Sequence, residues 1–153
     1  MRRTLKPQER QLLEFLISVN APLYRTDVAR WMEQIRTCTV REVNVQYCLS
    51  ISHDEKSYGG WENSKTLAHE LIAVDEGVPV LIYAIVHNTQ AGFVLHSFNI
   101  DRLDGEPIVN YPEAGDGLMI VERNKRVGGQ ICAIYMADRV RNLPRHVTSQ
   151  RNT

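Results

Sequence analysis

The chain has 153 residues, and its 18 lysines and arginines balance its 18 aspartates and glutamates, so its net charge is zero. Hydrophobic residues make up 43% of the sequence and charged residues 24%, which is typical of one globular domain and excludes a disordered or fibrous chain. The longest apolar run, residues 78–86, is far shorter than the roughly 20 residues that a membrane-spanning helix needs, so no membrane span is predicted.

Two amphipathic helices are predicted at the start of the chain. Pro7 suits the first turn of the first helix, which is expected to end near Asn20, and Pro22 lies in the linker to the second. The apolar positions recur at spacings of three and four residues, as one buried helix face requires. They are Leu12, Leu13, Leu16, Ile17 and Val19 in the first helix, and Tyr24, Val28, Trp31, Met32 and Ile35 in the second.

The pattern changes from helical to alternating at Thr37, which predicts strands in the rest of the chain. Two short strands are expected first, and a long loop over residues 53–64 follows them. Three longer strands should then form a meander, because turns that contain glycine separate them. The predicted strands are 40–45, 47–52, 66–74, 78–87, 93–101, 118–121 and 130–135.

The predicted fold class is therefore α+β, with two N-terminal helices packed on a largely antiparallel meander sheet of five to seven strands. Residues 1–137 are expected to form a single domain. Residues 138–153 are rich in Arg, Asn, Ser and Thr and should form a basic, flexible tail.

The zero net charge hides a segregation of charge along the chain. Residues 1–52 carry a net charge of +3 and residues 123–153 one of +6, whereas residues 53–122 have three basic and twelve acidic side chains, a net charge of −9. Such a distribution bears on partners and on association rates rather than on the fold. The acidic centre predicts a protein partner with a basic surface.

The residues predicted to bind this partner lie on turns and strand edges of the acidic centre. Two aromatic residues in the charged loop are candidate anchors, because aromatic side chains often carry the binding energy of an interface. An ordinary solvated acidic face, with the aromatic residues folded back on the sheet, is the alternative. The predicted binding residues are Asp75, Glu76, Asp101, Asp104 and Glu106, with Tyr58 and Trp61 as the anchors.

No motif for catalysis, a cofactor or a metal is found in the sequence. There is no G-x-S-x-G elbow, no phosphate-binding glycine loop and no H-E-x-x-H zinc motif around His69. His87 and His96 would face each other only if the hairpin between them has an even number of loop residues. The sequence therefore predicts a protein that is not an enzyme and that has no catalytic residue, metal or cofactor; an enzyme without a recognisable motif is kept as an alternative.

Cysteine usage and the first residues bear on the compartment. Cys38, Cys48 and Cys132 are odd in number and widely spaced, which indicates reduced thiols rather than a disulfide or a zinc site. Lys6 and Glu9 fall where a secretory signal would need an apolar stretch. A cytoplasmic protein is expected.

Nucleic-acid binding is the second alternative. Arg25, Arg30 and Arg36 line the second predicted helix, and residues 123–126 and the tail add further positive charge. The acidic centre of the chain would repel phosphates, and no third helix follows in the arrangement that a winged helix needs. A nucleic-acid-binding regulator is therefore kept only as an alternative.

Four short motifs occur between about Leu5 and Pro112: residues 5–9 with Leu12 and Leu13, residues 40–43, residues 75–80 and residues 104–108. In this combination the chain resembles small bacterial immunity proteins encoded beside polymorphic or contact-dependent toxins. The resemblance implies an α+β protein that acts by binding. With the acidic centre of the chain, it leads us to expect a toxin-neutralising immunity protein that covers a basic toxin surface with its acidic face.

Overall fold

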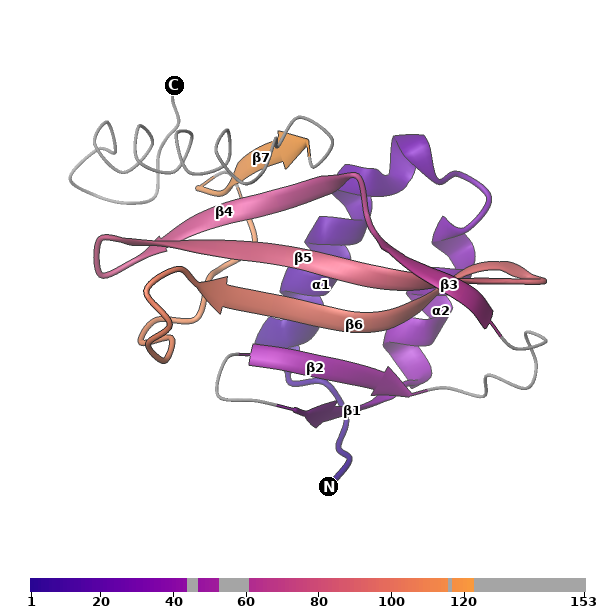
Figure 1. The fold of residues 1–153 in the computed structure, drawn as a ribbon, viewed down its shortest axis with the longest axis horizontal. Coiled ribbons are helices and arrows are strands. Elements are labelled where there is room, and N and C mark those ends of the chain that lie inside the picture. Colours follow the sequence, from indigo (N-terminus) through magenta and orange to yellow (C-terminus); the bar gives the residue numbers. More distant parts are fainter. Residues whose placement is uncertain (44–46, 53–60, 116, 123–153) are drawn as a thin grey trace.

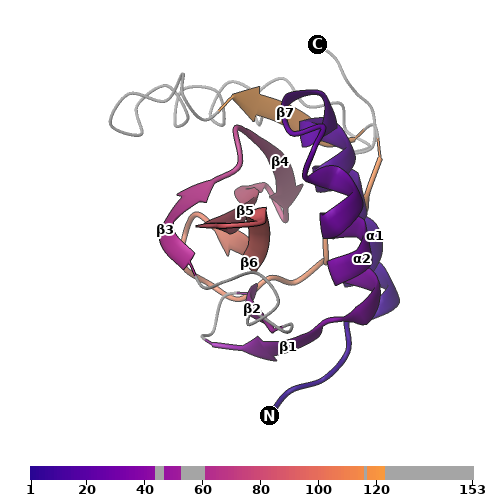
Figure 2. The same cartoon turned by 90° about the vertical axis from the view of Figure 1, so that its right-hand side faces the viewer.

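The computed structural model describes residues 1–43, 47–52, 61–115 and 117–122, and it places two helices on one face of an antiparallel sheet (Figures 1 and 2). The predicted α+β fold, with two N-terminal helices on a largely antiparallel sheet of five to seven strands, is confirmed, and the described residues form a sheet of seven strands. None of the described helices has the length and apolar character that crossing a membrane requires. The predicted strand 130–135 and the predicted tail 138–153 lie outside the described residues.

Both helices form where the pattern predicts them, but the predicted apolar face of the second is wrong at two positions: Tyr24 precedes the helix, and Met32 is 39% exposed. The first, α1 (Pro7–Asn20), has proline in its first turn, and the buried carboxylate of Glu9 accepts a hydrogen bond from the backbone N–H of Lys6 at 2.8 Å. Both oxygens of Glu9 also bind the guanidinium of Arg3, each at 2.8 Å. A short 3-10 turn, η1 (Ala21–Leu23), then leads to the second helix, α2 (Val28–Thr37).

Seven strands form one sheet in the spatial order β1-β2-β6-β5-β4-β7, and β3 pairs with the end of β5 that β4 does not reach. The strands are β1 (Thr39–Glu42), β2 (Tyr47–Ser52), β3 (Trp61–Thr66), β4 (His69–Asp75), β5 (Val78–Thr89), β6 (Gly92–Arg102) and β7 (Met119–Glu122).

The predicted strand boundaries differ most from the structure in three places. The first strand, expected to reach residue 45, ends as β1 at Glu42. Residues 61–64, expected in a loop, belong to β3, because they pair with β5 although their sequence is polar. The predicted strand 66–74 is interrupted at Leu67 and Ala68, where Leu67 is buried in the core and the tyrosine hydroxyl of Tyr24 accepts a hydrogen bond from the Ala68 N–H. No glycine or proline marks this break, so the sequence alone does not reveal it.

The long hairpin β5–β6 forms the centre of the sheet and turns through only two residues, Gln90 and Ala91. This loop has an even number of residues, which is the condition under which His87 and His96 are expected to face each other. A register shift after Ile85 leaves His96 as an extra residue in β6, and the rings of His87 and His96 stack with their centroids 3.8 Å apart.

The core lies between the helices and the sheet. Trp31 of α2 is fully buried and packs with aliphatic side chains from α1 and from the central strands. Burial of this apolar surface is the main force that holds the helices on the sheet. Other fully buried members of the core are Leu12, Leu13, Leu16, Ile17, Leu49, Leu67, Val80, Ile82, Ala84 and Phe98.

Helix α2 also forms hydrogen bonds with the backbone of β6. They lie at residues that precede Ser97, where the described register of β2 against β6 begins. The indole N–H of Trp31 donates to the carbonyl of Phe93 at 2.9 Å, and the amide oxygen of Gln34 accepts from the N–H of Leu95 at 3.0 Å. These two hydrogen bonds fix α2 against β6, in addition to the packing of the helix in the core.

Candidate protein-interaction surface

Asp75 anchors one end of the molecule, where several of the acidic residues predicted to bind a partner lie. It ends β4, and only 1% of its surface is exposed. One carboxylate oxygen accepts from the N–H of Val109 at 2.7 Å and from Arg102 at 2.9 Å. The other accepts from the backbone N–H and the side-chain amide of Asn110, at 2.9 and 3.1 Å. Asp75 therefore ties the segment after β6 to the β4–β5 hairpin.

Burial alone would raise the pKa of the Asp75 carboxyl, but the hydrogen bonds from Val109, Asn110 and Arg102 outweigh it, so the pKa lies below its usual value. Asp75 is thus a charged, fully bonded structural residue. It was predicted to bind a partner, but its burial removes it from the contact surface. A sequence pattern cannot distinguish it from its exposed neighbours, because its partners are 27 to 35 residues away.

Arg102 is the second anchor, with 9% of its side chain exposed. Its guanidinium contacts Asp75, lies 3.7 Å from Glu76 and binds both carboxylate oxygens of Asp104, at 2.9 and 3.2 Å. The hydrogen bond from Arg102 is the main cause that lowers the pKa of Asp104. This arginine holds the hairpin turn and the segment after β6 in one arrangement.

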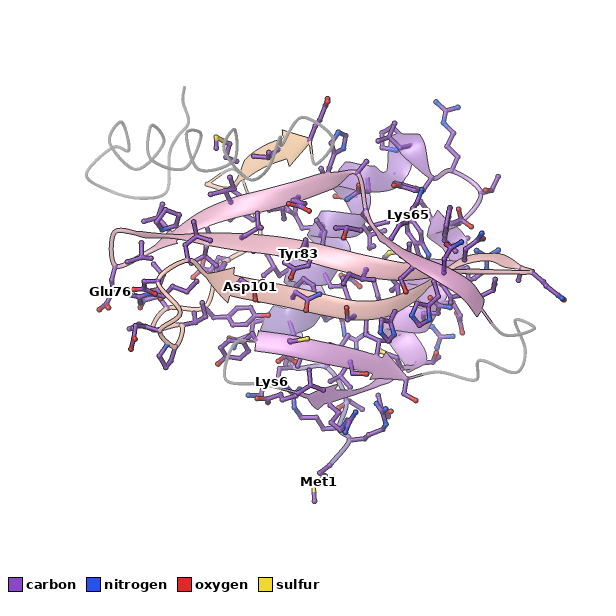
Figure 3. All side chains as sticks on the ribbon, in the orientation of Figure 1. Met1, Lys6, Lys65, Glu76, Tyr83 and Asp101 are labelled. Atoms are coloured by element: carbon purple, nitrogen blue, oxygen red, sulfur yellow. The ribbon has the colours of Figure 1, made fainter. Side chains whose placement is uncertain are left out.

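Exposed side chains surround these two anchors and form what we call the acidic end. Glu76 is at the β4–β5 turn, where it and Gly77 both have positive φ angles, 51° and 79°, as a two-residue hairpin turn of type I′ requires. Asp104 accepts a hydrogen bond from the N–H of Glu106 at 3.0 Å. The acidic end comprises Glu76, Leu103, Asp104, Glu106 and Val109 (Figure 3 labels Glu76).

The acidic end contains two exposed aliphatic residues that were not among the predicted binding residues. Leu103 is 49% exposed and Val109 is 59% exposed. Both are held by backbone hydrogen bonds, Leu103 to the carbonyl of Pro79 at 3.0 Å and Val109 to Asp75. Large aliphatic side chains ringed by charges are a common composition of a protein-interaction site. No periodic pattern singles them out, because both lie outside strands and helices.

Two other predicted binding residues lie elsewhere on the molecule. Asp101 accepts a hydrogen bond from the hydroxyl of Tyr83 at 2.9 Å, on the sheet face opposite the helices (Figure 3). Trp61 pairs with Thr89, whereas the acidic end adjoins Val78 at the other end of β5. At the usual rise of a strand, Val78 and Thr89 are about 36 Å apart along β5, so Trp61 and the acidic end do not form one site. Tyr58 lies outside the described residues.

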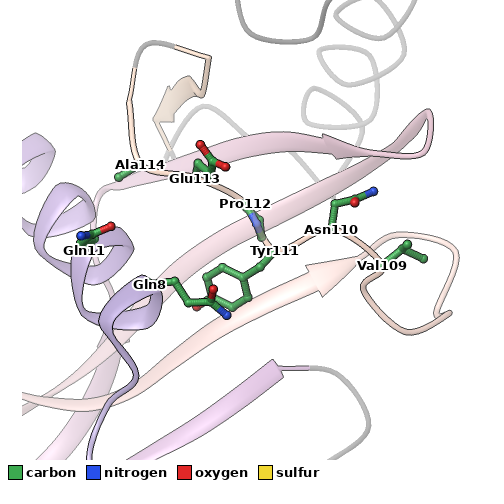
Figure 4. A pocket seen from close by; sticks show the side chains of 8 residues that line it. All are labelled: Gln8, Gln11, Val109, Asn110, Tyr111, Pro112, Glu113 and Ala114. Atoms are coloured by element: carbon green, nitrogen blue, oxygen red, sulfur yellow. The ribbon is translucent and has the colours of Figure 1, made fainter.

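A polar cleft lies beside the acidic end, between α1 and the segment after Val109 (Figure 4). Its volume is about 510 Å³, within the range of sites that take small ligands or side chains. One wall is Tyr111, whose ring stands edge-on to Tyr47 with the centroids 5.5 Å apart. The lining residues are Gln8, Gln11, Val109, Asn110, Tyr111, Pro112, Glu113 and Ala114.

The thiols and other ligand-type side chains give no sign of redox or metal chemistry within the described residues. Cys38 and Cys48 are free, and burial raises the pKa of both thiols, which keeps them protonated at neutral pH. No group of three or more His, Cys, Asp or Glu side chains that could hold a metal occurs in this part of the chain.

Comparisons with protein-family models, with curated proteins and with solved structures found no match to this chain.

Proposed function

We propose that the protein is a non-catalytic binding protein whose acidic end covers a basic surface of a partner protein. More specifically, we propose that it is an immunity protein that neutralises a toxin domain such as a nuclease. The substrate-binding surface of a nuclease must be basic because nucleic acid is a polyanion. The observation that carries the proposal is the combination of exposed acids and exposed aliphatic side chains on one anchored surface.

The charge of this end favours a basic partner. Among the described residues, Asp75, Glu76, Asp104 and Glu106 contribute four carboxylates and Arg102 contributes one guanidinium, a net charge of −3 for these five side chains. Complementary charge steers two proteins together and raises the association rate at low ionic strength. Leu103 and Val109 supply apolar area that a partner can bury, and the surrounding acids would form the polar rim.

The anchoring of the acidic end also supports a binding role. Its turn and the segment after β6 are both bound to the buried Asp75 and to Arg102. A surface that is already ordered loses less conformational entropy when it binds. Exposed residues on such a surface can therefore contribute most of their contact energy to affinity.

The nucleic-acid alternative receives less support from the helices. The guanidinium of Arg30 binds Asp27 at 2.7 Å and donates to the carbonyl of Phe93 at 3.0 Å, and Arg36 pairs with Glu33. Two of the three arginines that suggested a basic helix are thus paired within the molecule.

The test begins with a search of the neighbouring genes for a toxin domain, and a domain found there serves as the candidate partner. The double variant E76K/E106K reverses two exposed charges of the acidic end, and E33K/E42K makes the same change in net charge elsewhere. We expect the first variant to slow association about tenfold or more at low salt and the second to have little effect, because only the first alters the interface. Equal association rates for the two variants would contradict the proposal.

A further inference from the structure

The cleft between α1 and residues 109–114 adjoins the acidic end through Val109, which belongs to both. Figure 4 shows the cleft as a trough, with Gln8 and Gln11 projecting from the helix on one side and the segment from Val109 to Ala114 on the other. A partner that covers the acidic end would therefore lie beside the mouth of this cleft.

The lining of the cleft is rich in hydrogen-bond acceptors. The amide nitrogen of Asn110 donates to the Asp75 carboxylate at 3.1 Å, and a carboxylate can only accept, so the nitrogen must face Asp75. The amide oxygen of Asn110 is then left to accept a hydrogen bond from a ligand. Gln8 and Gln11 are exposed and contribute further amide oxygens, and the exposed carboxylate of Glu113 contributes the negative charge.

Among the residues that the structure describes, none of those that line the cleft is basic, and Glu113 is its one charged side chain. Two cations are close in the sequence, but neither belongs to the wall. Lys6 precedes the helix, and the guanidinium of Arg10 donates to the carbonyl of Ile35 at 3.0 Å. A carboxylate among amide oxygens is the environment that a guanidinium or an ammonium group requires.

We propose that this cleft takes a basic side chain, arginine or lysine, of the partner protein. This inference rests on the proposed function, because it names the group that the partner inserts beside the acidic end. The volume exceeds that of one side chain, so the adjoining main chain can enter as well and use the amide groups of Gln8 and Gln11. The cleft would then set the register of the partner on the surface.

The test uses the full chain and a small probe, so it does not depend on any partner. N-acetyl-arginine amide is titrated into isotope-labelled protein, with N-acetyl-citrulline amide as the neutral probe of nearly the same shape. The side-chain amide signals of Gln8, Gln11 and Asn110 are followed by NMR. We expect the arginine probe to shift these signals in the millimolar range and the citrulline probe to bind at least threefold more weakly, because exposed ion pairs are weak.

Variants locate the binding site of the probe. We expect E113Q to weaken arginine binding about threefold to fivefold and the matched control E33Q on α2 to have little effect on the three amide signals. Equal binding of the two probes, or an arginine affinity unchanged by E113Q, would overturn the inference about the cleft.

The two proposals fail in different ways. If the cleft does not bind arginine while E76K/E106K still slows association with the partner, the proposed function stands and the cleft inference is lost. If the cleft binds arginine but charge reversal at the acidic end leaves association unchanged, the cleft recognises a basic group outside the proposed interface, and the proposed function is lost.

Discussion

Replacing Asp75 with asparagine tests whether one buried carboxylate holds the acidic end together. One oxygen of Asp75 accepts from Asn110 twice, and the other accepts from Val109 and Arg102. An asparagine has one oxygen and one NH₂ group, so it can keep only one of these pairs. Its NH₂ group would face two donors and lose both hydrogen bonds.

The expected loss of stability follows from these two hydrogen bonds. A hydrogen bond to a charged group contributes about 1.5 to 3 kcal/mol, so two lost bonds correspond to about 3 to 6 kcal/mol. Water entering the exposed segment reduces the loss, and we expect D75N to lower the free energy of unfolding by about 3 kcal/mol. For a chain of this size the melting temperature would fall by roughly 6 to 12 °C.

Urea denaturation followed by circular dichroism measures this loss, with D104N as the matched control. Asp104 binds the same arginine but is exposed, so D104N should have a small effect. A loss below about 1 kcal/mol for D75N, or equal losses for the two variants, would refute the anchoring role of Asp75.

A comparison of the wild-type protein with D75N also gives a prediction about pH. Because the pKa of Asp75 is lowered in the folded state, its contribution to stability is present above its unfolded pKa of about 3.9. This contribution is lost as the pH falls through the lower folded value. The stability difference between wild type and D75N should therefore be constant at neutral pH and shrink below about pH 4. A difference that stays constant down to the acid unfolding of the protein would show that the Asp75 pKa is not lowered.

Three further predictions concern other parts of the molecule. Gly92 has a φ of 110°, and a Cβ there would lie 2.6 Å from Oδ1 of Asp27. We therefore expect G92A to lower the free energy of unfolding, measured by urea denaturation, by about 1 to 3 kcal/mol. An unchanged denaturation midpoint would contradict the close packing of α2 on this turn. Cys38 should react with a thiol reagent at pH 7 only as the protein unfolds, because burial raises its pKa; rapid labelling of the native protein would show that the thiol is accessible. The double variant L103S/V109S should melt at the wild-type temperature but bind the partner about tenfold more weakly by calorimetry, and unchanged affinity would exclude these side chains from the interface.

The fold could be predicted largely from the sequence because periodicity and turn chemistry are local. The change of period at Thr37 marks the end of the helices, and the Glu76-Gly77 pair marks a hairpin turn. The strand β3 was not predicted, because its polar residues are held by pairing with β5 rather than by burial of an apolar face.

The candidate site could be predicted only in part. The charges of Glu76, Asp104 and Glu106 point to the acidic end, but their grouping depends on Arg102 and on the buried Asp75. The cleft brings Gln8 and Gln11 of α1 together with residues about a hundred positions later, and no local pattern contains that contact.

The most direct test of the central claim is the association rate constant with the candidate toxin domain as a function of salt. The account predicts that wild-type association is fast at low ionic strength and slows steeply as salt rises, because salt screens the acidic end. It also predicts that E76K/E106K associates about tenfold or more slowly at low salt and that the two rates converge at high salt. A wild-type rate independent of salt and equal to that of the variant would contradict the claim that the acidic end meets a basic surface.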